Sequence, residues 1–419
     1  MKYFFIASIG CFGRHLDCER IKNYFTANNV ALTTDPQKAD YLFISTCGLT
    51  KLHEDLSIDD ITRFKRYHAK MIVGGCLPEM NTRRISDVFN GKTISTKDLD
   101  RIDELFPDFK VKYKDIPDGN RICLTGQDHP HQGGNSLKEI DLFDLYRFCN
   151  ALKEIGRRLL SKDPVALQKA TPTHMPQMPL IDINNNFFSL RIASGCFGAC
   201  SYCNIKKAIG NLRSKPVSLL LEELRKALHN KQYRINIVSS DSGAYGVDIH
   251  SSLPELLESI LKEDTRIVIE YLANMNPSWV CRYGNELLSL FGSKRIKSMS
   301  SAIQSGSERI LKLMHRNTDL DDFKTVLKKL KKVHPRIRMR TQVIVGFPTE
   351  TAQDIRDTIE VIKECRFNEV DVFYYHETEM MDSAKLSPKV AHEDIVERIR
   401  SIRKELSVFT TVNFFNVRG

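Results

Sequence analysis

Three cysteines in the stretch SGCFGACSYCNIKK, residues 194–207, have the spacing of a metal centre. Cys196, Cys200 and Cys203 follow a C-x3-C-x2-C pattern, and together they are called the loop triad. Zinc ribbons use two C-x2-C pairs, and disulfide scaffolds spread their cysteines through a small secreted chain. No further cysteine follows before Cys281. The loop therefore offers three thiolates to a metal centre and leaves one coordination position open.

Three further cysteines each come at the end of an apolar run near the N-terminus. KYFFIASIGC ends at Cys11, ADYLFISTCG reaches Cys47 and AKMIVGGCLP reaches Cys76, which together are called the strand-end triad. These runs alternate with helical stretches, so residues 1–115 are predicted to form a small parallel α/β sheet domain. Ligands of open α/β sheets bind at the carboxyl ends of the strands. A ligand role for the triad is therefore favoured over three buried small hydrophobes.

The loop triad follows the first of six strand–helix units over residues 186–385. Strands are expected at 187–192, 234–239, 266–272, 296–303, 338–345 and 369–375, with amphipathic helices between them. This pattern predicts a partial TIM-type (β/α)6 barrel with its active site at the carboxyl ends of the strands. The fold class is thus α/β, with a small sheet domain followed by a barrel. Residues 116–185 are expected to hold a helical insertion (137–169) and a linker, and residues 386–419 a C-terminal helix and tail.

Composition limits the class of protein. The chain has 419 residues, 42% of them hydrophobic, and no run of eighteen apolar residues that would span a membrane. Its apolar start is not followed by a signal-peptide cleavage site. Eleven cysteines without a secretion signal indicate a reducing, cytoplasmic compartment, where clustered thiols usually hold metal. The net charge of +10 suits binding to nucleic acid or to an acidic peptide, and serves solubility equally well.

The C-x3-C-x2-C loop after the first strand of a β/α barrel resembles the radical S-adenosylmethionine (SAM) superfamily. The resemblance implies that the loop triad binds three irons of a [4Fe–4S] cluster, whose fourth iron is chelated by SAM. Soft thiolates are the ligands that iron–sulfur clusters favour. Tyr202, between the last two cysteines, matches the family position that packs near the adenine of the cofactor.

Other motifs resemble one branch of that superfamily, the methylthiotransferases. GCFGRHLDCERI, ADYLFISTCG and VGGCLPEM look like its N-terminal domain, in which three cysteines hold a second [4Fe–4S] cluster. SSDSGAYGVD, IQSGSERILKLMHRN and VIVGFPTET look like its barrel motifs. The resemblance implies two [4Fe–4S] clusters and SAM as cofactors, with the strand-end triad as ligands of the second cluster. In this family a 5′-deoxyadenosyl radical abstracts a hydrogen, and sulfur and a methyl group are then added to the carbon.

Four polar residues are candidates for the cofactor and catalytic site. Asp241, after the second barrel strand, is expected to contact the SAM amino group, although a strand-end cap is an equal reading. Gln304, after the fourth strand, matches a glutamine that the family points into the cavity. Both are predicted as catalytic and cofactor-binding residues, and Glu270 and Gln342 are expected to face the same mouth. The remaining cysteines are expected to be buried thiols: Cys18, Cys123, Cys149, Cys281 and Cys365.

The chain departs from the family pattern at the expected substrate end. Arg14 stands where asparagine is usual, SSA (300–302) replaces His-x-Pro, Gln342 replaces aspartate, and TEMM (378–381) replaces an Arg-x-Gly-Thr-like stretch. The chain is also expected to lack the family's C-terminal TRAM barrel, and the stretch between Cys76 and Cys196 is longer than usual. These departures put the usual substrate in doubt.

Two substrate classes and one non-enzymatic role remain open. The first is a peptide or protein side chain, for example in a ribosomally made precursor peptide, with the 137–169 helix as a docking surface. The second is a tRNA base, with the basic stretch 324–340 contacting phosphates. The same stretch is also typical of a solvated helix face followed by a strand. The third is an iron–sulfur electron carrier or sensor. The expected partners of the enzyme are a reducing donor such as flavodoxin or ferredoxin and a source of sulfide, with no membrane association.

Overall fold

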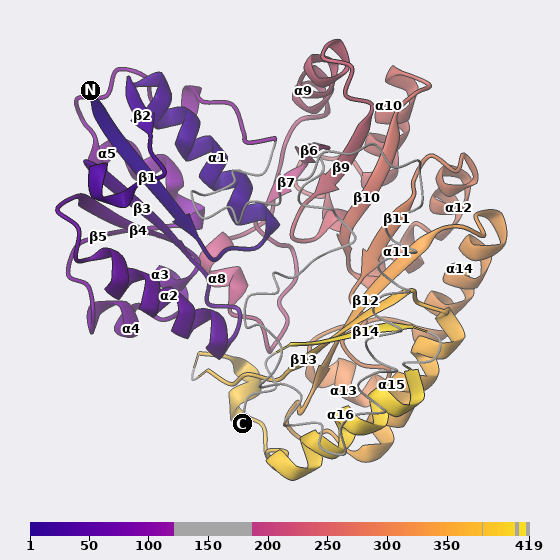
Figure 1. The fold of residues 1–419 in the computed structure, drawn as a ribbon. Helices are drawn as coiled ribbons and strands as arrows, with labels where there is room; N and C mark the ends of the chain where they lie inside the picture. Colours follow the sequence, from indigo (N-terminus) through magenta and orange to yellow (C-terminus); the bar gives the residue numbers. More distant parts are fainter. Residues whose placement is uncertain (121–186, 379, 407–409, 416–419) are drawn as a thin grey trace, which may run out of the picture.

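The structure is a computed structural model that describes residues 1–120, 187–378, 380–406 and 410–415. It has two lobes, an N-terminal sheet domain and an open barrel, with the short helix α8 (Ile205–Ile209) at their boundary (Figure 1). The predicted insertion helix at 137–169 lies outside the described residues. Within the described residues, no helix is long and apolar enough to cross a bilayer.

The N-terminal lobe is the predicted parallel α/β sheet. Its strand order is β2-β1-β3-β4-β5, and all neighbouring strands are parallel. The strands are β1 (Lys2–Ser8), β2 (Val30–Leu32), β3 (Tyr41–Thr46), β4 (Lys70–Gly75) and β5 (Lys92–Ser95). The helices include α1 (Phe12–Ala27), α2 (Lys51–Phe64), α3 (Leu77–Met80), α4 (Thr82–Ser86) and α5 (Ile102–Leu105). The three predicted strands are confirmed, and β2 and β5 extend the sheet at its two edges.

Alternation along the strands builds two cores, one on each face of this sheet. Phe4 and Ile6 of β1 pack on one face with Phe25 of α1. Phe5 packs on the opposite face with Phe64 of α2. Because both faces are covered, β1 is apolar on both sides, as expected of a strand in a parallel sheet.

The barrel lobe is a seven-stranded parallel sheet with the order β14-β13-β12-β11-β10-β9-β6. Its strands are β6 (Phe188–Arg191), β9 (Arg234–Val238), β10 (Val268–Met275), β11 (Ser298–Ser301), β12 (Arg338–Val345), β13 (Glu369–Tyr374) and β14 (Thr411–Phe415). The six predicted strands are confirmed. The seventh, β14, is a finding of the structure, because the expected tail pairs in parallel with β13 after helix α16 (His392–Leu406).

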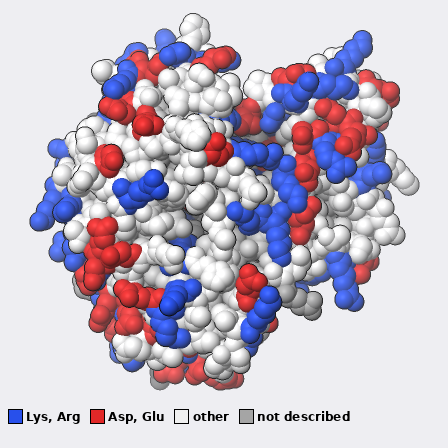
Figure 2. All heavy atoms as spheres, turned by 180° about the vertical axis from the view of Figure 1, so that it is seen from behind, with Lys and Arg blue, Asp and Glu red and all other residues white. Residues whose placement is uncertain are grey.

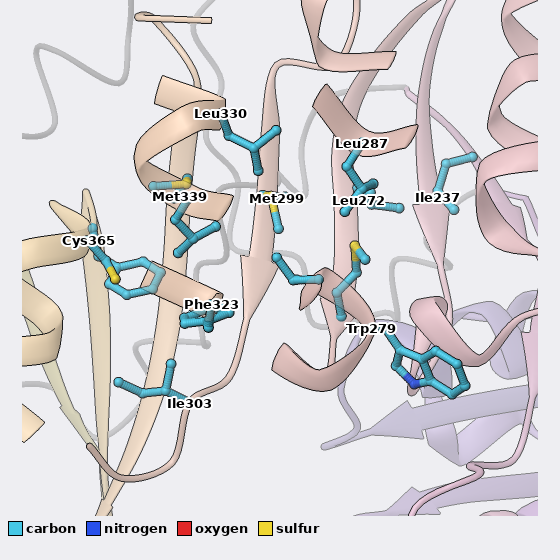
Figure 3. Close-up of a cluster of buried hydrophobic side chains, with 14 of the residues drawn as sticks. Ile237, Leu272, Trp279, Leu287, Met299, Ile303, Phe323, Leu330, Met339 and Cys365 are labelled. Atoms are coloured by element: carbon cyan, nitrogen blue, oxygen red, sulfur yellow. The ribbon is translucent and has the colours of Figure 1, made fainter. Parts of the chain in front are cut away.

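Helices cover the outer face of the barrel sheet. They include α9 (Val217–His229), α10 (Leu253–Glu263), α11 (Pro277–Arg282), α12 (Gly284–Gly292), α13 (Glu308–Leu313), α14 (Leu320–Val333) and α15 (Ala352–Cys365). Figure 3 shows strand side chains such as Met299 and Met339 packed against helix side chains such as Phe323 and Leu330. Alternate residues of the same strands, among them Ser300, Arg340 and Gln342, belong to no apolar cluster. Polar side chains therefore occupy these positions on the inner face of the sheet.

The two lobes are joined by apolar and charged contacts. Cys76 and Met80 of the N-terminal lobe pack on Ala208 of α8. Phe12, at the start of α1, packs on Tyr271 and Ala273 of β10. The carboxyl ends of β1, β3 and β4 point toward the barrel (Figure 1). On the opposite view, Lys and Arg side chains gather along the seam between the lobes, with Asp and Glu beside them (Figure 2).

Candidate functional site

The loop triad lies just after β6, where the barrel sheet opens. Gly195 has a φ of +72°, and a Cβ there would lie 1.8 Å from the backbone oxygen of Asn211, so only glycine fits this turn. A Cβ on Gly198 would lie 3.7 Å from the Sγ atoms of both Cys196 and Cys200. These two thiols therefore flank the same point of the loop.

The chemistry of the loop triad fits an iron–sulfur cluster. All three cysteines are free and partly exposed. Burial raises the pKa of Cys196 to about 11, and the carboxylate of Asp241 adds to this rise. Burial likewise raises the pKa of Cys203. Among the described residues, no three His, Cys, Asp or Glu side chains are placed to share one metal ion. Three thiolates are the soft ligands that an iron–sulfur cluster takes.

Tyr202 is held by a residue that the sequence analysis did not single out. Its Oη accepts a hydrogen bond of 2.9 Å from Nη1 of Arg316, and Nη2 of Arg316 donates to the carbonyl of Ala302 at 2.8 Å. Arg316 is 8% exposed, and its Nε has no partner among the described residues. Its charge also interacts with Cys200 and Asp241. Arg316 lies inside the motif IQSGSERILKLMHRN, which was the only signal for it.

Asp241 is a buried carboxylate close to the loop triad. Its Oδ2 accepts from Trp279 Nε1 at 3.1 Å, and its Oδ1 accepts from the backbone of Asn276 at 3.4 Å. Burial raises the pKa of Asp241, and these neutral donors oppose the rise. No basic side chain of the described residues forms an ion pair with it. Phe197 packs edge-on against Trp279, with ring centroids 5.9 Å apart. The carboxylate of Asp241 can therefore form an ion pair with a cationic ligand.

Gln304 is both strained and unsatisfied. Its φ is +66°, a left-handed conformation that is uncommon outside glycine. Its backbone is fixed to β12, since its N–H donates to Gln342 at 2.8 Å and its carbonyl accepts from Ile344 at 2.9 Å. Its Oε1 is buried without a partner in the described part of the chain. A strained residue with an unpaired buried amide is typical of a ligand site.

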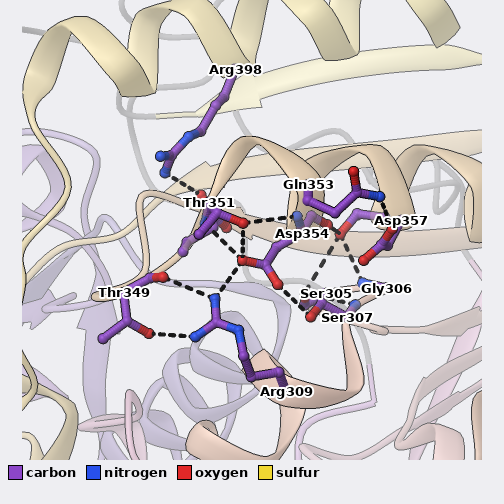
Figure 4. A network of polar contacts seen from close by, with 12 residues as sticks. Ser305, Gly306, Ser307, Arg309, Thr349, Thr351, Gln353, Asp354, Asp357 and Arg398 are labelled. Atoms are coloured by element: carbon purple, nitrogen blue, oxygen red, sulfur yellow. Dashed lines mark hydrogen bonds and ion pairs between the residues drawn. The ribbon is translucent and has the colours of Figure 1, made fainter.

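The loop after Gln304 is held by a polar network (Figure 4). The backbone of Gly306 donates to Thr358 Oγ1 at 2.8 Å, and Ser307 donates to Asp354 at 2.5 Å. Arg309 forms a 2.5 Å ion pair with the same carboxylate. In the motif IQSGSERILKLMHRN, Gln304 directly precedes the residues that make these contacts. The network therefore positions the glutamine.

The barrel motif VIVGFPTET also has a structural role. Glu350 accepts from the backbone of Gly346 at 2.8 Å and pairs with Arg398 of α16 at 3.0 Å. Burial raises the pKa of Glu350 to about 7, against the effect of these partners. The motif therefore closes its own turn and ties it to the C-terminal helix.

Of the two weaker candidates, Gln342 lies at the site and Glu270 does not. Gln342 is hydrogen-bonded to Gln304 through its backbone and to Asp371 through its side chain. Glu270 lies near the amino-terminal end of β10, where it pairs with Arg234, the first residue of β9, at 2.8 Å. The expectation that Glu270 faces the mouth is wrong, because that ion pair is at the opposite end of the strands.

The cysteines of the strand-end triad follow the carboxyl ends of β1, β3 and β4. Cys47 and Cys76 are buried and Cys11 is exposed. Gly75, before Cys76, has a φ of +97°, and a Cβ there would lie 2.3 Å from the carbonyl oxygen of Thr46. Burial raises the pKa of Cys76 to about 11. Burial also raises the pKa of Cys47, and its thiol interacts electrostatically with those of Cys76 and Cys11. The three thiols thus lie within electrostatic range of one another.

The other cysteines within the described residues stand apart from both triads. Cys18, in α1, is buried in the core of the N-terminal lobe, and Cys365 is in the core of the barrel. Cys281 is partly buried and packs against the same barrel core. Cys123 and Cys149 lie outside the described residues.

Comparison with known proteins follows the same division of the chain. Residues 190–362 match the family described as the radical SAM superfamily. Residues 3–95 match the family described as uncharacterized protein family UPF0004.

Curated relatives match almost the whole chain. It is 27% identical over 407 residues to the threonylcarbamoyladenosine tRNA methylthiotransferase of Xenopus laevis, covering 96% of this chain and 64% of that protein. It is 26% identical to the ribosomal protein uS12 methylthiotransferase RimO of Carboxydothermus hydrogenoformans, covering 97% of this chain and 83% of that one. The chain thus spans less than two thirds of the frog protein and most of the bacterial one.

Solved structures share the fold. The radical SAM methyltransferase TsrM of Kitasatospora setae matches 92% of this chain and 77% of its own, with a TM-score of 0.57 and 12% identity. The cobalamin-dependent SAM radical enzyme OxsB matches 98% of this chain and 58% of its own, with a TM-score of 0.53 and 12% identity. The two family matches thus cover most of the barrel lobe and of the N-terminal lobe, and the curated relatives that align along almost the whole chain are methylthiotransferases.

Proposed function

We propose that this chain is a radical SAM methylthiotransferase that adds a sulfur atom and a methyl group at an unactivated C–H bond of a peptide or protein side chain. One observation carries the proposal. Two sets of three cysteines lie at the carboxyl ends of two parallel sheets, and Cys76 of one set packs on Ala208, in the helix that follows the other set. A radical site and a sulfur site must be neighbours if they act on one carbon.

The loop triad would hold a [4Fe–4S] cluster, and Asp241, Arg316 and Gln304 would hold SAM. When bound, these groups supply the radical that abstracts hydrogen, chemistry that side chains cannot perform. The buried carboxylate of Asp241 suits the ammonium of SAM, and the unpaired Nε of Arg316 suits its carboxylate. The amide of Gln304 offers one further acceptor in the mouth. Tyr202, fixed by Arg316, would pack beside the adenine.

The strand-end triad would hold the second cluster, with sulfur delivered from that side. Cys76 packs on Ala208 of the barrel lobe, and Phe12, which follows Cys11, packs on Tyr271 and Ala273 of β10. Contacts of this kind would limit the access of water to a reactive substrate carbon. Flavodoxin or ferredoxin would supply electrons, and sulfide would supply sulfur.

A peptide or protein substrate is favoured over tRNA by the charges of α14. In the tRNA alternative, phosphates would be contacted by the basic stretch 324–340, which includes lysines of α14. Lys324 and Lys328 instead pair with Glu364 of α15, at 3.5 and 2.8 Å. Two lysines of this helix are thus engaged by the chain's own carboxylates, which weakens their case as phosphate contacts. The tRNA alternative is supported by relatives that act on tRNA, such as the frog protein.

Anaerobic turnover with both substrate classes tests the proposal. The reconstituted enzyme is incubated with SAM, dithionite and sulfide, with either a peptide fraction or total tRNA, and products are measured by mass spectrometry. We expect the mass of an added SCH3 group on a peptide. A methylthiolated nucleoside instead would favour the tRNA alternative, and SAM cleavage without either product would contradict methylthiotransfer. The variant with alanine at all three loop-triad positions is the control for background modification.

A further inference from the structure

The amino-terminal edge of the N-terminal sheet carries an open hollow lined by polar side chains. The hollow has a volume of about 510 Å³, and its lining residues are Gln37, Arg66, Tyr67 and His68. Gln37 lies in a short 3-10 turn before β3, and the other three follow the end of α2 and precede β4. The amino ends of these strands point away from the barrel (Figure 1). A six-residue strand such as β3 places the hollow about 20 Å from the carboxyl edge of the sheet, so the hollow is distinct from both cysteine triads.

The side chains that line the hollow can all donate a hydrogen bond, and none of them carries a carboxylate. Nη2 of Arg66 donates to the Oη of Tyr67 at 3.0 Å, and the guanidinium lies 5.1 Å from the centre of the same ring. This hydrogen bond uses one of the five N–H groups of the guanidinium. The Tyr67 hydroxyl accepts here, so it can still donate its own hydrogen. The lining is therefore a set of donors suited to an anion.

Neighbouring cations have structural roles that Arg66 does not share. Lys65 Nζ donates to the carbonyl of Val88 at 3.0 Å, which joins the end of α2 to the loop between α4 and β5. Arg63 lies in the last turn of α2, 4.0 Å from Asp60, where a cation also suits the negative end of the helix dipole. Arg66, by contrast, is bonded to its sequence neighbour, and this contact joins no two elements of the fold. Its charge is thus not explained by the folding of this lobe.

The acids of the loop before β3 do not neutralise that charge. Oδ1 of Asp35 accepts from the backbone N–H of Gln37 at 3.0 Å, and Oδ2 lies 3.8 Å from Nζ of Lys38. Asp40 accepts from a backbone N–H of β1 at 2.7 Å. No carboxylate of the described residues forms an ion pair with Arg66. The hollow therefore presents a positive charge that is open to a ligand.

We propose that the hollow is a binding site for a phosphate group, either free or carried by a small molecule such as a nucleotide. Arg66 and His68 are its principal contacts, with Gln37 and Tyr67 as further donors. The planar guanidinium matches two phosphate oxygens at once, which gives short, charge-assisted hydrogen bonds. Small-molecule sites have volumes of about 300–1,000 Å³, so the hollow has room for more than the phosphate. The site lies beyond the proposed function and requires neither cluster.

Equilibrium dialysis of the full-length, cluster-loaded chain tests the proposal. The probes are radiolabelled inorganic phosphate and uridine 5′-monophosphate, which lacks the adenine of SAM, both at fixed ionic strength. We expect Arg66→Ala to weaken binding at least about ten-fold, because charge-assisted hydrogen bonds are lost. Arg66→Lys keeps the charge but loses the planar fork, so it should weaken binding less. Arg63→Ala is the matched control, because it removes a neighbouring cation that pairs with Asp60 and should leave the affinity near wild type.

The relative affinities of the two probes identify the source of the phosphate. Tighter binding of the nucleotide assigns a nucleotide-like ligand to the site, and the reverse order assigns free phosphate. Arg66 and His68 are exposed, so their variants should fold, and unchanged SAM cleavage verifies this. If Arg66→Ala lost that activity, His68→Ala should still weaken phosphate binding.

Two results would overturn the proposal. One is that neither probe binds saturably. The other is that Arg63→Ala and Arg66→Ala weaken binding equally, as a diffuse positive surface would require. Both results are independent of methylthio transfer, which the anaerobic turnover assay tests separately.

Discussion

Replacing Gly306 by alanine tests whether the loop after β11 positions Gln304. A Cβ on Gly306 would lie 2.5 Å from the Cα of Thr358, 2.6 Å from the carbonyl oxygen of Asp357 and 2.7 Å from the amide nitrogen of Thr358. All three are backbone atoms of α15, where ordinary carbon contacts lie at about 3.5–4.0 Å. The loop or the helix must therefore move by about 1 Å.

The expected cost follows from overpacking. Such clashes typically cost about 1–3 kcal/mol, and the lower entropy of the unfolded chain offsets about 0.4–1 kcal/mol of this. The free energy of unfolding should fall by about 1–2 kcal/mol. For a domain of about 150–250 residues, each kcal/mol lowers the melting temperature by about 2–4 °C. SAM affinity should also fall, because Gln304 is two residues away and shares the displaced backbone.

Thermal unfolding followed by circular dichroism and equilibrium dialysis with SAM measure the two effects. Gly292→Ala is the matched control, because a Cβ at the end of α12 meets nothing within 4 Å, so SAM affinity should stay at wild type and the free energy of unfolding should rise by about 0.4–1 kcal/mol. An unchanged melting temperature for Gly306→Ala would refute the packing argument. A destabilised variant with normal SAM affinity would show that Gln304 is not placed by this loop.

Three other perturbations test separate parts of the site. Asp241→Asn should weaken SAM binding by about ten-fold or more with iron content unchanged, since an amide does not attract an ammonium and cannot accept from both Trp279 Nε1 and the backbone N–H of Asn276; equilibrium dialysis checks this. Alanine at all three loop-triad positions should halve the iron from about eight atoms and abolish 5′-deoxyadenosine formation, as measured by iron assay and chromatography. Glu369 has a pKa raised to about 7 by burial, so its contribution to stability is full below its ordinary pKa of 4.5 and is lost as pH rises through 7. Glu369→Gln should therefore show a smaller loss of unfolding free energy between pH 5 and pH 8 in urea titrations, and an equal loss would contradict this assignment.

The strands and both triads could be predicted because their signals are local. Runs such as residues 2–8 and 41–46 are apolar, rich in β-branched and aromatic residues, and bounded by turns. A cysteine at the end of each parallel strand then lies at one sheet edge whatever the detailed packing. Strand β14 was not predicted, because a short, half-polar edge strand gains its stability only by pairing with β13.

The remaining differences depend on contacts that are distant in sequence. Glu270 has the right parity to face the inner side of the sheet, but its height along β10 is set by pairing with Arg234. Arg316 follows α13 and meets Tyr202 across 114 positions of the chain, which no local pattern indicates. Arg14 could be recognised as unusual, but its shared carboxylate with Arg191 joins two lobes. Sequence periodicity gives faces and edges, and tertiary pairing decides which side chains meet there.

The division of labour between the two cysteine sites is tested most directly by one variant, with alanine at Cys11, Cys47 and Cys76. Iron content, 5′-deoxyadenosine and methylthiolated product are measured on the same anaerobic preparation, beside wild type. The loop triad and its surrounding polar residues stay intact, so we predict about half of the iron and continued SAM cleavage, with no sulfur added to substrate. Full methylthiolation by this variant would contradict the account, because the strand-end triad would then be structural.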